Sequence, residues 1–256
     1  MQPIIDIVNL SKGYNSRGMK VAALQNVSMS VEPGSFTTLI GPSGCGKSTI
    51  LKIIAGIALP YDGDVRYKGQ TVSEINTNVG FVTQDSNLFP WLTLIENVEL
   101  GLKIHGTPAA QRRAEAKRFI ETMDLNGFEH HYPYELSGGM QKRGSIIRTL
   151  IYDPDIILMD EPFGPLDAQT RLLLQDELLR IWDRSRKTIL FVTHDLTEAI
   201  ALSDKVVLMT KRPGTVKRAF DVSLPRPRNV FEIHKEKGFT DLYHEIWECF
   251  KTEIRI

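Results

Sequence analysis

A glycine-rich loop near the start of the chain constrains the fold more than any other stretch. It follows an apolar run over 36–40 that is typical of a buried strand, and it precedes a helical pattern over 50–56. Strand, glycine loop and helix together form the context of a phosphate-binding loop, because glycines let backbone N–H groups approach an anion and the helix N-terminus adds positive charge. Lys47 is expected to neutralise the β- and γ-phosphates, and Ser48 to offer its hydroxyl to Mg²⁺. The predicted loop comprises Gly41, Pro42, Ser43, Gly44, Cys45, Gly46, Lys47, Ser48 and Thr49.

The composition is that of an ordinary globular protein with balanced charge. Of 256 residues, 42% are hydrophobic, and 31 basic residues balance 31 acidic ones. This balance gives no support to nucleic-acid binding, so we expect no nucleic-acid partner. The two cysteines, Cys45 and Cys249, make no disulfide framework, which fits a reducing cytoplasm. The N-terminus lacks a signal-peptide pattern and the apolar runs are too short to span a bilayer, so we expect another chain to supply any membrane span.

Strand patterns frame both halves of the chain, as expected for an α/β protein. Between them we predict a polar loop containing Gly13 and Gly18 and a turn at 61–63. A short helix is predicted over 196–202, and Asp167 is expected to cap a long helix that ends near Arg184. The predicted strands are 4–10, 21–31, 36–40, 64–67, 79–83, 156–160, 188–193, 205–210 and 216–222.

The middle of the chain, 88–152, is predicted to be a helical insertion into this core. Thr93 is expected to cap a helix over 94–103, a second helix is predicted to begin at Thr107-Pro108 and run to 123, and a third to begin at Ser137 and end near 152. We therefore assign 1–224 to one domain with this insertion.

A C-terminal tail, 225–256, is predicted to follow a stiff linker at 225–228 and to be helical from 230. One side of the tail is expected to be lined by Phe231, Phe239, Leu242, Ile246, Trp247 and Phe250.

Two acidic residues follow a buried strand at 156–160. In sheets of this kind such a position lies beside the phosphate-binding loop. Asp160 is expected to hold Mg²⁺, and Glu161 to polarise the attacking water. Taken alone, the pair could instead be acids on a solvated turn, but the phosphate-binding loop favours the metal and water roles.

The stretch Leu136–Gln141 is the third candidate motif. A serine followed by Gly138 and Gly139 at a helix start is either a second anion site or a simple helix cap. Together with the two motifs above, this stretch resembles the signature sequence of the ATP-binding subunits of ATP-binding-cassette (ABC) transporters. The resemblance covers about residues 4–222 and is carried by all three motifs.

Other family motifs match position by position. Gln84 matches the glutamine that in the family touches Mg²⁺ and the attacking water, and His194 matches the switch histidine that contacts the γ-phosphate. Asp167 matches an aspartate at the dimer interface, and Tyr14 the aromatic residue that stacks on adenine. The family usually carries two small apolar residues where this chain has Gly144-Ser145, and a glycine there could loosen the helix.

The resemblance implies a P-loop NTPase with a RecA-like core, an antiparallel β subdomain and the inserted helical signature subdomain. It implies ATP and Mg²⁺ as cofactors, with Ser48, Gln84 and Asp160 at the metal and Glu161, His194 and Gln84 in catalysis. Two anion sites on different subdomains make sense if two copies meet head to tail, with Ser137 of each at the other's ATP. Gly138 and Gly139 would then share in binding that nucleotide.

The chain has a single cassette and no fused membrane span, and in these respects it resembles an importer subunit. The stretches 84–93, 202–204 and 212–214 resemble those of the nitrate, sulfonate and taurine importers. This implies a peripheral protein on the cytoplasmic face of the membrane, a transmembrane permease docked near 84–103, and indirectly an extracytoplasmic solute-binding protein. A cargo such as a pyrimidine precursor, a soluble ABC ATPase acting on a macromolecule, and a non-hydrolysing module remain alternatives.

Overall fold

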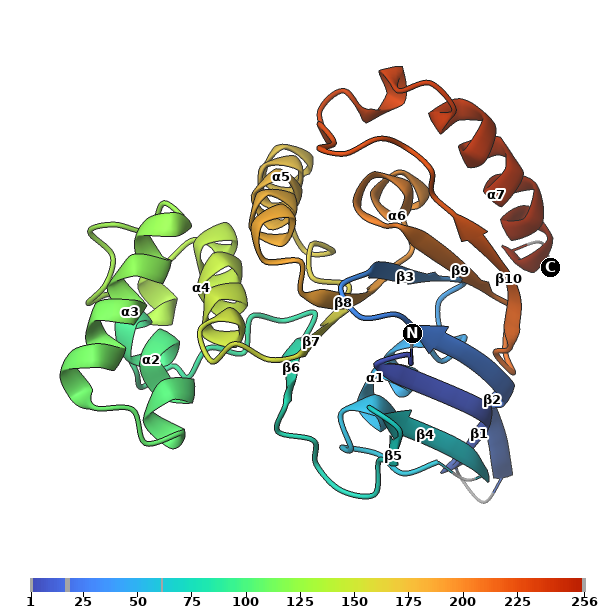
Figure 1. The fold of residues 1–256 in the computed structure, drawn as a ribbon, viewed down its shortest axis with the longest axis horizontal. Helices are drawn as coiled ribbons and strands as arrows, with labels where there is room; N and C mark the ends of the chain where they lie inside the picture. Colours follow the sequence, from blue (N-terminus) through green and yellow to red (C-terminus); the bar gives the residue numbers. More distant parts are fainter. Residues whose placement is uncertain (1, 17–18, 61, 255–256) are drawn as a thin grey trace.

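A six-stranded sheet forms the centre of the protein. The computed structural model describes residues 2–16, 19–60 and 62–254 (Figure 1). The strand order is β10-β9-β3-β8-β7-β6, and all neighbours are parallel except β9 and β10. Its strands are β3 (Phe36–Ile40), β6 (Val79–Val82), β7 (Ile156–Asp160), β8 (Thr188–Thr193), β9 (Lys205–Met209) and β10 (Val216–Asp221).

The two faces of this sheet contribute to different hydrophobic clusters. On β7, Ile156 and Leu158 belong to the cluster that also contains helix α1 (Lys47–Ile54), whereas Ile157 and Met159 belong to the other. Because side chains alternate along a strand, a continuous apolar run such as 156–159 supplies both clusters. Helices α5 (Ala168–Ser185) and α6 (Leu196–Leu202) contribute to the second cluster.

A second sheet is antiparallel, with the order β2-β1-β4-β5. Its strands are β1 (Ile5–Ser16), β2 (Met19–Val31), β4 (Asp62–Tyr67) and β5 (Gln70–Thr71). The loop predicted at Gly13 is wrong, because Gly13 pairs with Ala22 inside the long β1–β2 hairpin. Gly18 lies outside the described residues.

The turn predicted at 61–63 is also wrong, in the part that the structure describes. Gly63 lies in β4 with φ 85°, and a Cβ there would come within 2.3 Å of the Asn9 carbonyl oxygen. The register of β1 and β4 shifts at this point, between Val8 and Ser11. The glycine therefore marks a β-bulge, and its turn-like conformation explains the sequence signal.

The predicted helical insertion is present between β6 and β7 and lies to one side of the sheets (Figure 1). Thr93 and Glu96 form the capping box of α2, and the second helix begins one residue after Pro108 rather than at it. Ser137 caps α4, which ends at Leu150, two residues before the predicted end. The helices are α2 (Leu94–Ile104), α3 (Ala109–Thr122), a 3₁₀ turn η1 (Pro133–Glu135) and α4 (Gly138–Leu150).

Gly144 allows α4 to pack closely on the chain around α2. A Cβ at this glycine would lie 2.8 Å from Leu94 Cδ1 and 3.4 Å from Leu88 Cδ1. Both leucines are buried. The glycine that looked like a weak point of the helix therefore occupies a position where any side chain would force its neighbours to move.

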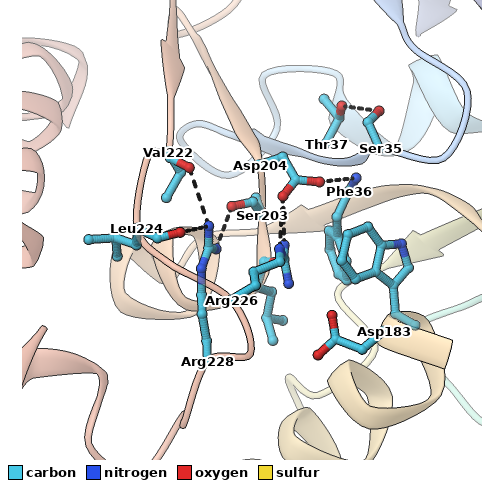
Figure 2. Close-up of polar contacts among 12 residues, drawn as sticks. Ser35, Phe36, Thr37, Asp183, Ser203, Asp204, Val222, Leu224, Arg226 and Arg228 are labelled. Carbon is cyan, nitrogen blue, oxygen red and sulfur yellow. Dashed lines mark hydrogen bonds and ion pairs between the residues drawn. The ribbon is translucent and has the colours of Figure 1, made fainter. Parts of the chain in front are cut away.

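The segment predicted to be a stiff linker, 225–228, is instead anchored to the core (Figure 2). The buried Arg228 donates hydrogen bonds to the carbonyl oxygens of five residues, Ile200, Ala201, Ser203, Val222 and Leu224. Arg226 pairs with Asp204 at 2.9 Å and lies over the Trp182 ring. These two arginines fix the start of the tail to the end of α6. Composition alone did not reveal them as anchors.

The tail then packs along the core as a 3₁₀ turn, η2 (Ile233–Lys235), and helix α7 (Phe239–Ile254). Phe239, Ile246 and Phe250 are buried as predicted, with Leu242 partly buried. Phe231 and Trp247 are exposed, so the prediction that they line the packed side is wrong. Within residues 2–16, 19–60 and 62–254, no helix is long and apolar enough to cross a bilayer.

Candidate functional site

The glycine-rich loop connects β3 to α1 as predicted. Gly44 and Gly46 have positive φ angles, 76° and 105°, and a Cβ at Gly46 would lie 2.4 Å from Leu24 Cδ2. Only glycine fits there without displacing a buried side chain. Helix α1 begins at Lys47, so Ser48 and Thr49 stand in its first turn, where backbone N–H groups are free to bind an anion.

Lys47 is buried inside the loop that it belongs to. Its Nζ donates hydrogen bonds to the carbonyl oxygens of Gly41 at 2.8 Å and Pro42 at 3.1 Å. The neighbouring Cys45 is also buried, and burial raises the pKa of its thiol, which keeps it unreactive. The loop thus holds a fixed cation, and Cys45 fills space as the sequence suggested.

Ser48 and Asp160 bring two hard oxygen ligands together. Ser48 Oγ donates to Asp160 Oδ1 at 2.8 Å, and burial raises the pKa of Asp160 against the effect of this hydrogen bond. A hydroxyl beside a carboxylate suits Mg²⁺, which prefers oxygen ligands. In the described parts of the chain, no group of three or more His, Cys, Asp and Glu side chains could hold a metal ion by itself, so a metal here would rely on few protein ligands and on phosphate oxygens.

Glu161 and His194 face one another across neighbouring strands. Glu161 has φ 42°, and its backbone N–H donates to the Val192 carbonyl at 3.0 Å, which turns the chain at the end of β7. The carboxylate Oε2 lies 3.1 Å from His194 Nδ1. A carboxylate held by an imidazole at the edge of a phosphate site is suited to orient and polarise a water molecule.

Part of the glycine-rich loop, with Lys47, Ser48 and Glu161, lines a cavity of about 270 Å³. Tyr14 lies at its rim, 41% exposed, with its hydroxyl 3.3 Å from Thr49 Oγ1. The lining consists of Tyr14, Ala23, Ser43, Gly44, Gly46, Lys47, Ser48, Thr49, Glu161 and Arg212.

Arg212 is a lining residue that the sequence did not single out. The turn that carries it packs directly on the loop, since a Cβ at Gly214 would lie 1.9 Å from the Cys45 carbonyl oxygen. The only sequence signal was the Arg-Pro-Gly turn itself.

Ten of the predicted site residues do not line this cavity: Gly41, Pro42, Cys45, Gln84, Ser137, Gly138, Gly139, Asp160, Asp167 and His194. Asp160 and His194 each contact a lining residue, Ser48 and Glu161 respectively. Ser137 is exposed and accepts a hydrogen bond from the Met140 N–H, and Gly138 and Gly139 continue the same helix start. Asp167 is exposed and caps α5 by accepting from the N–H groups of Gln169 and Thr170.

Gln84 lies near the turn that follows Glu161. It is exposed, and its amide nitrogen lies 3.7 Å from the position of a Cβ on Gly164, in the turn after Glu161.

A buried carboxyl group supports the region behind His194. Glu198, on α6, is 6% exposed and accepts a hydrogen bond from Gln175 at 2.8 Å. Its own N–H donates to Asp195, which lies 3.9 Å from Arg171. Burial raises the pKa of Glu198 to about 7. Sequence reasoning did not single out this residue.

The fold and the cavity define a nucleotide-binding protein of the P-loop NTPase class. The sequence profile described as "ABC transporter" matches residues 24–164. The chain belongs to the ABC transporter family, as an ATP-binding, ATP-hydrolysing cassette. The predicted family and fold class are thereby confirmed.

Relatives match along nearly the whole chain. An uncharacterized ABC transporter ATP-binding protein, MJ0412 of Methanocaldococcus jannaschii, is 45% identical over 99% of this chain and 94% of its own. The aliphatic sulfonates import ATP-binding protein SsuB of Bacillus cereus strain ZK is 42% identical over 96% of each chain. The nitrate import ATP-binding protein NrtD of a Synechocystis strain is 39% identical over 94% of this chain and 93% of its own.

Among solved structures, the cassette MJ0796 has the same fold. Its dimeric post-hydrolysis state bound to ADP and Pi superposes with a TM-score of 0.76 and 32% identity, covering 85% of this chain and 98% of that one.

Proposed function

We propose that this chain energises import of a small oxyanion, such as nitrate, a sulfonate or taurine, through a separate membrane permease. The names of the SsuB and NrtD relatives support this assignment. In this role the protein is peripheral on the cytoplasmic face of the membrane, and a solute-binding protein outside delivers the cargo. The tail at 225–256 follows the cassette of 1–224 and packs on its core.

The observation that carries the proposal is that the nucleotide cavity is lined by only one of the two predicted anion-binding groups. The cavity is lined by the loop, Tyr14, Glu161 and Arg212 but not by the signature serine, Ser137, which is exposed on the helical subdomain. Both Ser137 and the loop are suited to bind anions. A head-to-tail homodimer would place each Ser137, with Gly138 and Gly139, at the ATP held by the other copy. The solved MJ0796 cassette is dimeric.

Each residue then has a defined task. Ser48, Asp160 and Gln84 hold Mg²⁺, which supplies charge neutralisation at the phosphates. Lys47 binds phosphate oxygens, and Tyr14 stacks on the base. Glu161 polarises the attacking water, and His194 holds that carboxylate and reaches the γ-phosphate. Asp167 lies at the interface between the copies.

The permease docks on the loop that follows β6. Phe89 and Trp91 are 36% and 69% exposed, and their rings lie 5.2 Å apart. Arg148 of α4 lies under Phe89 at 5.5 Å from the ring centroid. Large exposed aromatic side chains that lie close together are typical of a protein interface. Cysteines placed at 87–92 should cross-link to the permease. Labelling only at distant positions would contradict this docking site.

ATP-dependent dimerisation tests the function. We expect Glu161→Gln to bind ATP, to lose hydrolysis and to accumulate as a dimer with Mg-ATP in light scattering, because the amide keeps the shape of the carboxylate but cannot polarise water. Adding Ser137→Arg should restore the monomer. Lys47→Ala should abolish turnover and weaken ATP binding, and Glu115→Gln on α3 is the control for an equal change of charge. A Glu161→Gln protein that stays monomeric at saturating ATP would refute the proposed dimer.

A further inference from the structure

Lys142 is a buried cation one turn and a half into the signature helix α4. It is 1% exposed. Among the described residues, no carboxylate lies within 4.0 Å of its Nζ, so the ammonium group makes no ion pair. Burial lowers the pKa of Lys142 to about 8, against the attraction of Asp85 and Asp160.

Two backbone carbonyls of the Gln84 loop, residues 83–93, satisfy this cation. Lys142 Nζ donates to the Thr83 oxygen at 2.5 Å and to the Gln84 oxygen at 3.0 Å. In Figure 1, α4 is the helix of the insertion that lies nearest the sheet, and β6, which leads into this loop, is the strand beside it. The contact thus joins the signature helix to the backbone of Gln84, the residue that we predict to engage the nucleotide.

Stability alone does not explain a lysine at this position. Removing an ammonium group from water costs several kcal/mol, and an apolar residue of the same length would avoid that cost. The geometry offers another role. A short, charge-assisted link between two segments makes them move together, whereas apolar packing allows them to slide.

We propose that Lys142 is a positioning residue that couples the Gln84 loop to the signature helix of the same chain. When Gln84 engages the nucleotide in its own cavity, Lys142 carries α4 with it and sets Ser137 at the angle needed for the other copy's nucleotide. Occupation of one site thereby prepares the second site. This inference rests on the proposed head-to-tail dimer.

Replacement of the cation by an apolar residue of similar length tests the coupling. In Lys142→Met we expect kcat to fall by about tenfold or more while the affinity of the monomer for ATP stays within about twofold, because Lys142 does not line the cavity. The cooperativity of ATP hydrolysis should also be lost. Lys142→Arg, which keeps two N–H donors for the two carbonyls, should restore most of kcat.

Arg143→Met is the matched control on the same helix. Arg143 is the next residue and is partly buried, but its contacts run to Glu177 on α5 and to the Met123 carbonyl rather than to the Gln84 loop. Equal losses in Arg143→Met and Lys142→Met would mean that any loosening of α4 has the same effect, and would overturn the inference. A Lys142→Met protein with unchanged kcat and cooperativity would also overturn it.

The Glu161→Gln background separates failure of this inference from failure of the proposed function. If Glu161→Gln alone does not dimerise with Mg-ATP, the proposed function fails. If it dimerises and the double variant with Lys142→Met dimerises at the same ATP concentration, only the coupling by Lys142 is refuted. We expect the double variant to need about tenfold more ATP.

Discussion

Glu198 should make the stability of the protein depend on pH across the neutral range. Burial raises its pKa from 4.5 to about 7 in the folded state. Between these two values the folded protein holds the proton and the unfolded chain releases it, so the free energy of unfolding falls as the pH rises. Each pH unit in this window lowers the free energy of unfolding by about 1.4 kcal/mol, so the total decrease is about 3 kcal/mol.

Glu198→Gln removes this titration but keeps an oxygen that can accept from Gln175. We expect its free energy of unfolding, relative to wild type, to rise by about 3 kcal/mol between about pH 5 and about pH 8. Urea unfolding of both proteins at several pH values measures this difference.

Glu96→Gln is the matched control, with a pKa shift of the opposite sign. The N–H and the hydroxyl of Thr93 lower the pKa of Glu96. Its stabilising effect is present above the unfolded pKa of 4.5 and is lost only as the pH falls below it. The difference from wild type should therefore stay flat over the same neutral range. A flat difference for Glu198→Gln as well would refute the assignment of a protonated carboxyl behind His194.

Three further substitutions test local features. Gly144→Val should lower the free energy of unfolding, measured in urea, by about 2 kcal/mol through overpacking. Its control is Gly138→Ala, where a Cβ meets nothing within 4 Å, and this change should leave the free energy of unfolding unchanged or raise it. Arg228→Met should lower the free energy of unfolding by about 3 kcal/mol because it leaves buried carbonyl groups unpaired. Arg218→Met, at an exposed arginine, should lower it by less than about 1 kcal/mol, and equal losses would argue against an anchored tail. Tyr14→Ala should weaken ATP binding about tenfold in a fluorescence titration, and Tyr14→Phe much less, if the ring rather than the hydroxyl binds the base.

Local patterns were sufficient wherever one segment decides its own structure. The strand at 188–193 and the helix at 196–202 begin and end at the predicted residues, since an apolar run flanked by threonines defines the strand and a cap at Asp195 begins the helix. The loop at 41–49 and the acid pair were recognisable for the same reason: their chemistry requires a fixed spacing.

Features that depend on distant contacts were not predictable from spacing. The strand β1 continues through Gly13 because β2 pairs with it, and a sequence window around Gly13 contains no such information. Arg212 reaches the cavity only because Gly214 packs on the loop near Cys45. Arg226 lies between two prolines and Arg228 follows the second, and this linker-like composition concealed residues that bind the end of α6.

The position of β6 at the edge of the sheet has a consequence for dynamics. β3, β7 and β8, which carry the phosphate loop, the acid pair and His194, each pair with strands on both sides, whereas β6 pairs only with β7. Backbone amides on the free side of an edge strand and in the loop after it open more readily than those in the interior of a sheet. In hydrogen–deuterium exchange, the segment that leads into Gln84 should therefore exchange fastest of the four, so that the sheet holds three sides of the nucleotide site rigid and leaves one compliant.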